Sequence, residues 1–207
     1  MKNVPLQEHP LIDHSLTILR NKKTPTEEFR RHAGIVSKIL LLEAMRNLHV
    51  KNFKIETPLA PMVGKKLKDE VVVVPVLRAG LAMLFAIQDF LPDVSVGFIG
   101  LERDEQTAQA REYYRKLPDI FSSHVVLVID PMLATGGSFD DSLTALKIKG
   151  AKRLMVVCIV AAPEGIARIQ KNHPDVPIIT AAVDKRLNDR FFIVPGLGDF
   201  GDRYFGT

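Results

Sequence analysis

The sequence lacks the features that would place it outside the reducing interior of a cell. It has one cysteine, Cys158, which cannot form an internal disulfide bond. No apolar run approaches the roughly 18–20 residues that a membrane helix needs. The N-terminal stretch, MKNVPLQEHP, lacks the apolar centre of a signal peptide. These absences predict a cytoplasmic protein with no membrane-spanning segment.

The chain also lacks repeats, low-complexity tracts and polar linkers, so we expect a single domain over residues 1–207. Its six histidines are scattered and show no metal-ligand spacing. The composition, 46% hydrophobic and 25% charged, is that of an ordinary globular protein. A net charge of +4 suits a polyphosphate ligand or a nucleic acid but identifies neither.

The first third of the chain has a helical pattern. Thr24, Pro25 and Glu27 match a helix-start signature, with the threonine as cap and the glutamate completing a capping box. Apolar residues then recur at helical spacing from Phe29 to about Leu48. The next segment, TPLAPMVGKKL, mixes turn-formers with β-compatible residues, which predicts a loop or a projecting two-stranded arm. Such arms often make contacts between subunits.

From Val71 onward, short apolar runs alternate with helical patterns. Near-continuous runs such as VVVVPV and VVLVI are typical of strands buried on both faces. They predict an α/β fold with a central, mostly parallel sheet flanked by helices. The expected strands are Val71–Leu77, Val94–Leu101, His124–Ile129, Arg153–Ala161 and Pro177–Val183, and the expected helices are Gly80–Leu91, Gly137–Ile148 and Pro163–Asn172. In such folds ligands bind beyond the carboxyl ends of the strands.

The segment VIDPMLATGGS, from Val128 to Ser138, lies between an expected strand and an expected helix. Its glycines let backbone N–H groups turn toward an anion, and the helix N-terminus and two hydroxyls complete a phosphate site. No lysine follows the glycines, which excludes a Walker A loop, and dinucleotide-binding spacing is absent. Asp130, upstream of this cradle, can accept hydrogen bonds from sugar hydroxyls. Together these features predict a ribose 5-phosphate site; the alternative is a capped turn without a ligand.

This segment resembles the phosphoribosyl-pyrophosphate (PRPP) motif of the phosphoribosyltransferases. Most members have two adjacent acids, whereas here Asp130 is followed by Pro131, a departure typical of the uracil branch. The resemblance implies a type I phosphoribosyltransferase-like fold. It also implies PRPP contacts along the whole segment, which comprises Asp130, Pro131, Met132, Leu133, Ala134, Thr135, Gly136, Gly137 and Ser138.

Two further segments carry cations. Arg78 follows the strand expected over residues 71–77 and can present a fixed charge to a doubly charged group. In the resembled family this is the pyrophosphate loop, with Arg78 as a PRPP ligand. The segment GLERDEQTAQAREYYRKLPD corresponds to a mobile hood of the family, in which Arg103 contacts PRPP. From the residues alone, the two segments also fit a surface arginine and a solvated charged loop.

The chain closes with RFFIVPGLGDFGDRYFGT, where glycines beside aromatics indicate an extended segment that a flat ligand can approach. Uracil presents acceptor, donor and acceptor along one edge, and a backbone can offer the complement. Cytosine would leave a backbone N–H unpaired, at a cost of about 1–3 kcal/mol. VPGLGDFGDR is similar to the uracil-recognition loop of the uracil phosphoribosyltransferases, which implies base contacts from Ile193, Gly198, Asp199 and Phe200. Without that resemblance, the tail fits a flexible glycine-rich terminus.

The resemblance as a whole implies a uracil phosphoribosyltransferase, a glycosyltransferase of pyrimidine salvage that converts uracil and PRPP to UMP and pyrophosphate. Asp130, Arg103 and Asp199 are the implied catalytic residues, and Asp199 is also implied to bind PRPP. The implied cofactor is Mg²⁺, carried by PRPP without a direct protein ligand and linked to Asp199 through water. The family forms dimers or larger homo-oligomers, and GTP activates some members as an allosteric effector. We expect a transition state resembling an oxocarbenium ion and no strong general base.

Two alternatives stay open. One is the same chemistry on a purine, which needs a wider pocket, or on orotate, which needs a cation that VPGLGDFGD does not provide. The other is an RNA-binding regulator built on this fold, like the pyrimidine-attenuation family, which the basic charge balance permits. The enzyme interpretation is favoured, with PRPP and uracil as partners and no nucleic acid.

Overall fold

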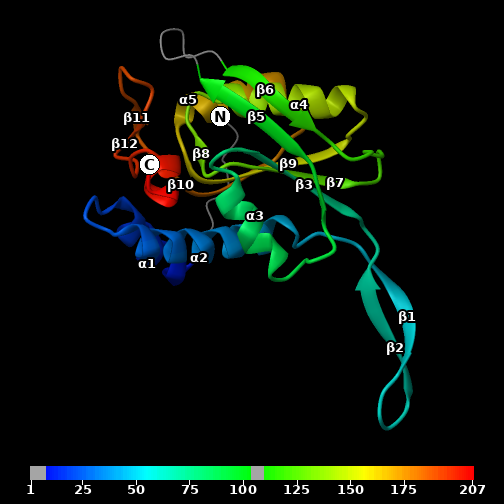
Figure 1. Ribbon diagram of the computed structural model, residues 1–207. Coiled ribbons are helices and arrows are strands. Elements are labelled where there is room, and N and C mark those ends of the chain that lie inside the picture. Colours follow the sequence, from blue (N-terminus) through cyan, green and yellow to red (C-terminus); the bar gives the residue numbers. More distant parts are fainter. Residues whose placement is uncertain (1–7, 104–109) are drawn as a thin grey trace.

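A computed structural model describes residues 8–103 and 110–207, with the backbone alone described for Arg103 and Ala110. Its centre is a sheet of order β10-β9-β7-β3-β5-β6 (Figure 1). Neighbouring strands on this path are parallel, except that β6 runs antiparallel to β5. In the same order their bounds are Ile178–Val183, Arg153–Ala161, Val125–Ile129, Val71–Leu77, Phe98–Arg103 and Ala110–Lys116. The predicted α/β fold with a mostly parallel sheet is confirmed.

Helices cover both faces of the sheet, which explains why its strands are apolar throughout. Val71 and Val73 of β3 pack in one core cluster with α1 (Pro10–Arg20), α2 (Thr26–Ala44) and α3 (Leu81–Gln88). Val72 and Val74 pack in a second cluster with α4 (Gly137–Ile148) and α5 (Pro163–Asn172). Figure 1 shows these two groups of helices on opposite sides of the sheet. Because alternate side chains of β3 are buried on opposite faces of the sheet, neither face of the strand is polar.

The helical N-terminal region consists of α1 and α2, and the predicted cap of α2 was wrong. Pro25 occupies the N-cap position with extended backbone angles, and no side chain caps the helix. The Thr24 hydroxyl instead donates to the carbonyl oxygen of Ile18 at 2.6 Å. The Ile18 carbonyl lies in the last turn of α1, where it accepts both this hydroxyl and the Asn21 N–H at 3.2 Å.

A two-stranded arm extends from the body of the molecule, as the sequence indicated (Figure 1). It is formed by β1 (Val50–Glu56) and β2 (Pro61–Leu67), which pair antiparallel along their whole length. The arm exposes several apolar side chains, among them Phe53 and Val63. Leu59, at the tip of the arm, is 96% exposed. An apolar surface of this kind indicates a contact site.

Smaller elements differ from expectation. The strand expected over residues 94–101 is interrupted at Gly97, which separates β4 (Ser95–Val96) from β5. The PRPP-like segment contains a short strand, β8 (Met132–Leu133), and a hairpin of β11 (Arg186–Leu187) and β12 (Ile193–Val194) precedes the C-terminal helix α6 (Phe200–Phe205). None of these short strands was predicted. Within residues 8–103 and 110–207, no helix is long and apolar enough to cross a membrane.

Candidate active site

A cavity of about 990 Å³ lies beyond the carboxyl ends of β3 and β7. It brings together three segments that the sequence singled out: the residue after β3, the loop after β7 and the C-terminal loop. Its wall is formed by Arg78, Ala79, Asp130, Met132, Ala134, Ser138, Asp189, Arg190, Phe191, Phe192, Ile193, Gly198, Asp199, Phe200 and Gly201. Parallel strands place their carboxyl ends at the same edge of a sheet, which is why residues far apart in sequence meet here.

The loop after β7 turns sharply into α4. Gly136 has a φ of +80° and forms the N-cap of α4, which begins at Gly137. A Cβ on Gly136 would also lie 3.0 Å from the carbonyl oxygen of Gly165 in α5. Backbone conformation and packing both require glycine there. The N-terminus of α4 is therefore presented beside Ser138 on the cavity wall, the arrangement expected for a phosphate site.

Two residues of the implied PRPP segment, Pro131 and Leu133, attach the loop to the central sheet. The Leu133 side chain is fully buried in the core on the α4–α5 face. Its carbonyl oxygen accepts from the Ala162 N–H at 2.8 Å, and the Pro131 carbonyl accepts from the N–H groups of Ile159 and Val160 at 2.9 and 3.0 Å. These bonds fix the loop against β9. A PRPP contact by Pro131 or Leu133 stays a prediction, as does one by Thr135, Gly136 and Gly137.

Asp130 is partly buried, and its surroundings raise the pKa of its carboxyl. Its Oδ1 accepts from the Met132 N–H at 3.4 Å, a long hydrogen bond. Burial, and to a smaller extent the charge of the nearby Asp199, raises the pKa of its carboxyl to about 7. A carboxylate with so few donors is stabilised by ligand hydroxyls that donate to it. Its environment suits a sugar-binding role, which stays a prediction.

Arg78 follows β3, and its side chain is exposed to solvent. Its side chain is 61% exposed, and Nη2 lies 3.7 Å from Oδ1 of Asp202. The turn behind it is tightly packed, because a Cβ on Gly80 would lie 2.6 Å from the Ile129 carbonyl oxygen. The guanidinium is therefore held on a fixed backbone while remaining free to meet an anion.

The C-terminal loop presents backbone to the cavity. The Ile193 and Phe200 side chains are buried in the core, where the Phe200 ring packs edge-on against Phe29 at 5.2 Å between centroids. Gly198 is exposed and has a φ of +82°, and Asp199 caps α6 by accepting from the Asp202 N–H at 3.0 Å. Anchored side chains on either side of an open backbone fit the predicted recognition of a flat base through N–H and C=O groups.

Sequence reasoning missed the part of the wall between β11 and β12, namely Asp189, Arg190, Phe191 and Phe192. Asn188 shapes this turn, since its Oδ1 accepts from the N–H groups of Arg190 and Phe192 at 3.0 and 2.9 Å. An Asn-Asp turn followed by two aromatic residues was the available signal. Arg190 also weakens the reason given against orotate, because it supplies a cation at the cavity.

Some predicted features cannot be placed. The side chain of Arg103 and the hood residues 104–109 lie outside the described residues, so the implied contact of Arg103 with PRPP stays a prediction. In the described part of the chain, no three His, Cys, Asp or Glu residues are grouped so that they could hold a metal ion.

Comparisons with known proteins identify the same family as the sequence resemblance. The model of the family "Uracil phosphoribosyltransferase" matches residues 6–207. The uracil phosphoribosyltransferase of Campylobacter concisus (strain 13826) is 47% identical over 207 residues, which is 100% of both chains. The AQ2163 protein from Aquifex aeolicus superposes with a TM-score of 0.94 at 34% identity, over 99% of each chain.

A more distant structure shows the fold. The adenine phosphoribosyl transferase from Trypanosoma brucei, in complex with AMP, pyrophosphate and ribose-5-phosphate, superposes with a TM-score of 0.60 at 13% identity. The alignment covers 87% of this chain and 82% of that one. The predicted type I phosphoribosyltransferase fold is confirmed. By its sequence match over nearly the whole length, the chain belongs to the uracil phosphoribosyltransferase family.

Proposed function

We propose that the protein transfers the 5-phosphoribosyl group of PRPP to N1 of uracil, giving UMP and pyrophosphate, and that the cavity is where this occurs. The observation that carries the proposal is the meeting of Asp130, the N-terminus of α4, Arg78 and the C-terminal loop around one space. These groups match the three parts of the two substrates: a phosphorylated sugar, a pyrophosphate and a flat base.

The sugar phosphate binds between Asp130 and α4. The Asp130 carboxylate accepts hydrogen bonds from the ribose hydroxyls, while Ser138 and the first N–H groups of α4 donate to the 5′-phosphate. Arg78 lies on the same wall and neutralises charge on the pyrophosphate. The family resemblance adds Arg103 as a second PRPP ligand. This arrangement places the anomeric carbon between the leaving group and the base.

Magnesium fits the chemistry of this wall. Asp130 and Asp199 are close enough for the charge of Asp199 to raise the pKa of Asp130, so a bound cation would relieve their repulsion. When bound with PRPP, magnesium would neutralise the leaving pyrophosphate, and Asp199 would reach it through water. The protein's own contribution is to position the substrates and hold fixed dipoles around a transition state resembling an oxocarbenium ion. No strong general base is required.

Uracil is selected by backbone groups of the loop Ile193–Phe200. Gly198 and Asp199 are exposed and line the cavity, and the absence of a side chain at Gly198 lets the base approach. A base with a donor at position 4 leaves a loop N–H unpaired, which costs about 1–3 kcal/mol.

Three further expectations are proposals at the level of the whole protein. The apolar arm supports a homo-oligomer in which the arm of one copy packs on another. A GTP effector and a cytoplasmic location rest on the family resemblance and on the sequence, respectively. No nucleic-acid partner is expected.

The direct test is consumption of labelled uracil, with and without PRPP and magnesium. Cytosine, orotate and hypoxanthine serve as competitors, and orotate is informative because Arg190 lies on the cavity wall. Formation of labelled UMP that depends on PRPP and is unaffected by the competitors supports the proposal. Preferred use of orotate or hypoxanthine would contradict it.

A further inference from the structure

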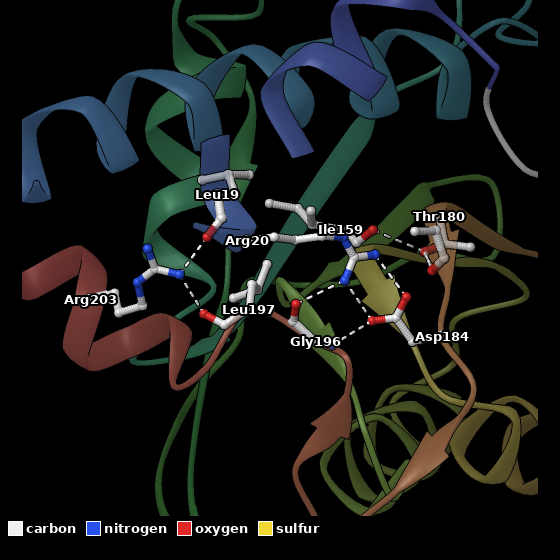
Figure 2. Close-up of polar contacts among 9 residues, drawn as sticks. Leu19, Arg20, Ile159, Thr180, Asp184, Gly196, Leu197 and Arg203 are labelled. Atoms are coloured by element: carbon white, nitrogen blue, oxygen red, sulfur yellow. Dashed lines mark hydrogen bonds and ion pairs between the residues drawn. The ribbon is translucent and has the colours of Figure 1, made fainter. Parts of the chain in front are cut away.

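The C-terminal loop is tied to the end of α1 by two arginines (Figure 2). Arg20, the last residue of α1, donates from Nη1 and Nη2 to the two carboxylate oxygens of Asp184, both at 2.7 Å. Asp184 follows β10, and its N–H donates to the Ala161 carbonyl of β9 at 2.9 Å. The side chains of Arg20 and Asp184 are 26% and 7% exposed. This ion pair is partly shielded from water and rests on the sheet, so its position is well defined.

The ion pair holds one residue of the loop, Gly196, by both its backbone N–H and its backbone carbonyl. Arg20 Nη1 donates to the Gly196 carbonyl at 2.8 Å, and the Gly196 N–H donates to Oδ2 of Asp184 at 2.8 Å. Gly196 has a φ of +59°, and a Cβ there would lie 2.1 Å from the Ile193 carbonyl oxygen. The pair therefore contacts a residue that offers only backbone, and its effect is to fix where that backbone lies.

A second arginine fixes the other end of the loop to the same turn of α1. Arg203 of α6 donates from Nη1 to the carbonyl oxygens of Leu19 and Leu197, and from Nη2 to that of Asn21 at 2.7 Å. Its guanidinium carbon lies 4.3 Å from the centroid of the Phe29 ring. The last carbonyls of a helix have no intrahelical partner, and this arginine supplies a donor to the Leu19 carbonyl of α1. The Asn21 carbonyl accepts from the Thr24 N–H at 3.1 Å as well.

The exposed residues Gly198 and Asp199 lie between these two attachments. Arg20, Asp184 and Arg203 are not among the residues that line the cavity, so their influence on a bound base is indirect. Backbone groups discriminate between bases only if their positions match the hydrogen-bonding edge closely. A loop with several glycines does not hold such a position by itself.

We propose that Arg20, Asp184 and Arg203 form a clamp that positions the Gly196–Asp199 backbone for uracil, so that the N-terminal helix α1 takes part in choosing the base. This inference rests on the proposed function. The three are positioning residues, and their loss weakens binding of the base more than binding of PRPP. Asp130, Ser138 and Arg78 are carried by other elements, and Asp199, the PRPP residue on the clamped segment, would reach magnesium only through water.

The test compares two ion pairs of similar geometry. Arg20→Lys keeps the charge but cannot make both bonds to Asp184 and the bond to Gly196. The matched control is Arg153→Lys, because Arg153 donates to both oxygens of Asp69 at 2.8 and 3.1 Å near the base of the arm. We expect Arg20→Lys to raise the KM for uracil about tenfold with little change in the KM for PRPP. Arg153→Lys should lower the melting temperature comparably and leave both KM values unchanged.

Asp184→Asn gives a second variant of the clamp, and discrimination between uracil and cytosine should fall in both clamp variants. A uracil KM that stays at the wild-type value, or rises equally in the Arg153→Lys control, would overturn the proposal. Hydrogen exchange gives a readout independent of activity. Amides of residues 196–201 should exchange faster in Arg20→Lys than in the wild type, while those of β7 stay protected. If the wild type does not use uracil, the proposed function fails, and unchanged exchange in this loop would separately reject the clamp.

Discussion

At the scale of single residues, Asp130 is the group whose environment most clearly matches a task. Burial raises the pKa of its carboxyl from 3.8 to about 7, and the Met132 N–H is its one recorded donor among the described residues. Its ionised form is therefore costly in the free protein and is stabilised when substrate hydroxyls donate to it. Sequence reasoning found this residue because an acid at a strand end before Thr-Gly-Gly-Ser is a local pattern.

Asp130→Asn should impair the use of PRPP far more than folding. The amide keeps the shape of the side chain but loses the charge that binds the sugar hydroxyls, so kcat/KM for PRPP should fall about a hundredfold. At pH 8 the variant should melt no lower than the wild type. The reason is that a raised carboxyl pKa means stability is lost as pH rises through about 7, and the amide cannot ionise. Asp141→Asn, an exposed change on α4, is the control; normal PRPP kinetics in Asp130→Asn would remove the sugar assignment.

The same pKa predicts a pH dependence. In the free enzyme, kcat/KM for PRPP should decrease below a pH of about 7, because Asp130 becomes protonated and no longer accepts from the sugar hydroxyls. Rates at saturating PRPP should be less sensitive, since bound substrate stabilises the ionised form. Steady-state kinetics from about pH 5.5 to about pH 9, on both sides of the expected pKa, provide the measurement. A profile that is flat across neutrality would show that this carboxyl is ionised well below 7.

At the scale of elements, sequence patterns predicted the long helices and strands and missed the strands of two residues. The bounds of β3, β9, α4 and α5 were predicted correctly because apolar runs and flanking glycine or proline mark them. The hairpin β11–β12 has two residues in each strand, too few to show any periodicity, and so the wall that it contributes was missed. The predicted cap of α2 was wrong because the Thr24 hydroxyl donates to a carbonyl of α1, that of Ile18.

Close packing between α5 and the PRPP loop gives a prediction at this scale. A Cβ on Gly165 would lie 2.5 Å from the Ala134 carbonyl oxygen, so Gly165→Ala should destabilise the protein by about 1–3 kcal/mol. Because it displaces the loop, it should also raise the KM for PRPP. Gly34→Ala is the matched control: this glycine lies in α2 with nothing within 4 Å of an added Cβ. That change should stabilise by about 0.5–1 kcal/mol. Denaturant unfolding measures both, and equal effects would contradict the packing argument.

At the scale of the whole molecule, the features that sequence could not supply are those that join distant segments. Arg20 and Asp184 are 164 residues apart, and neither belongs to a local motif. Their meeting follows from the topology, which brings the end of α1 to the carboxyl end of β10 and beneath the C-terminal loop. The resemblance implied that Gly198 and Asp199 belong to the site, whereas the contacts that attach their loop to α1 could be found only in the three-dimensional structure. The expected single domain stays a prediction, which one cooperative unfolding transition would support.

The arm carries the last prediction. Ile55 and Met62 face each other across β1 and β2 and are 40% and 48% exposed. A hairpin with so much apolar surface gains stability when a second copy covers it. If the wild type forms the proposed oligomer, replacing both residues by lysine should convert it to a monomer in sedimentation at micromolar concentration. Ile148→Lys is the control, since this residue is 83% exposed on α4, away from the arm, and its change should leave the oligomer intact. A wild type that sediments as a monomer would remove the arm as a subunit contact and leave its exposed face without a partner.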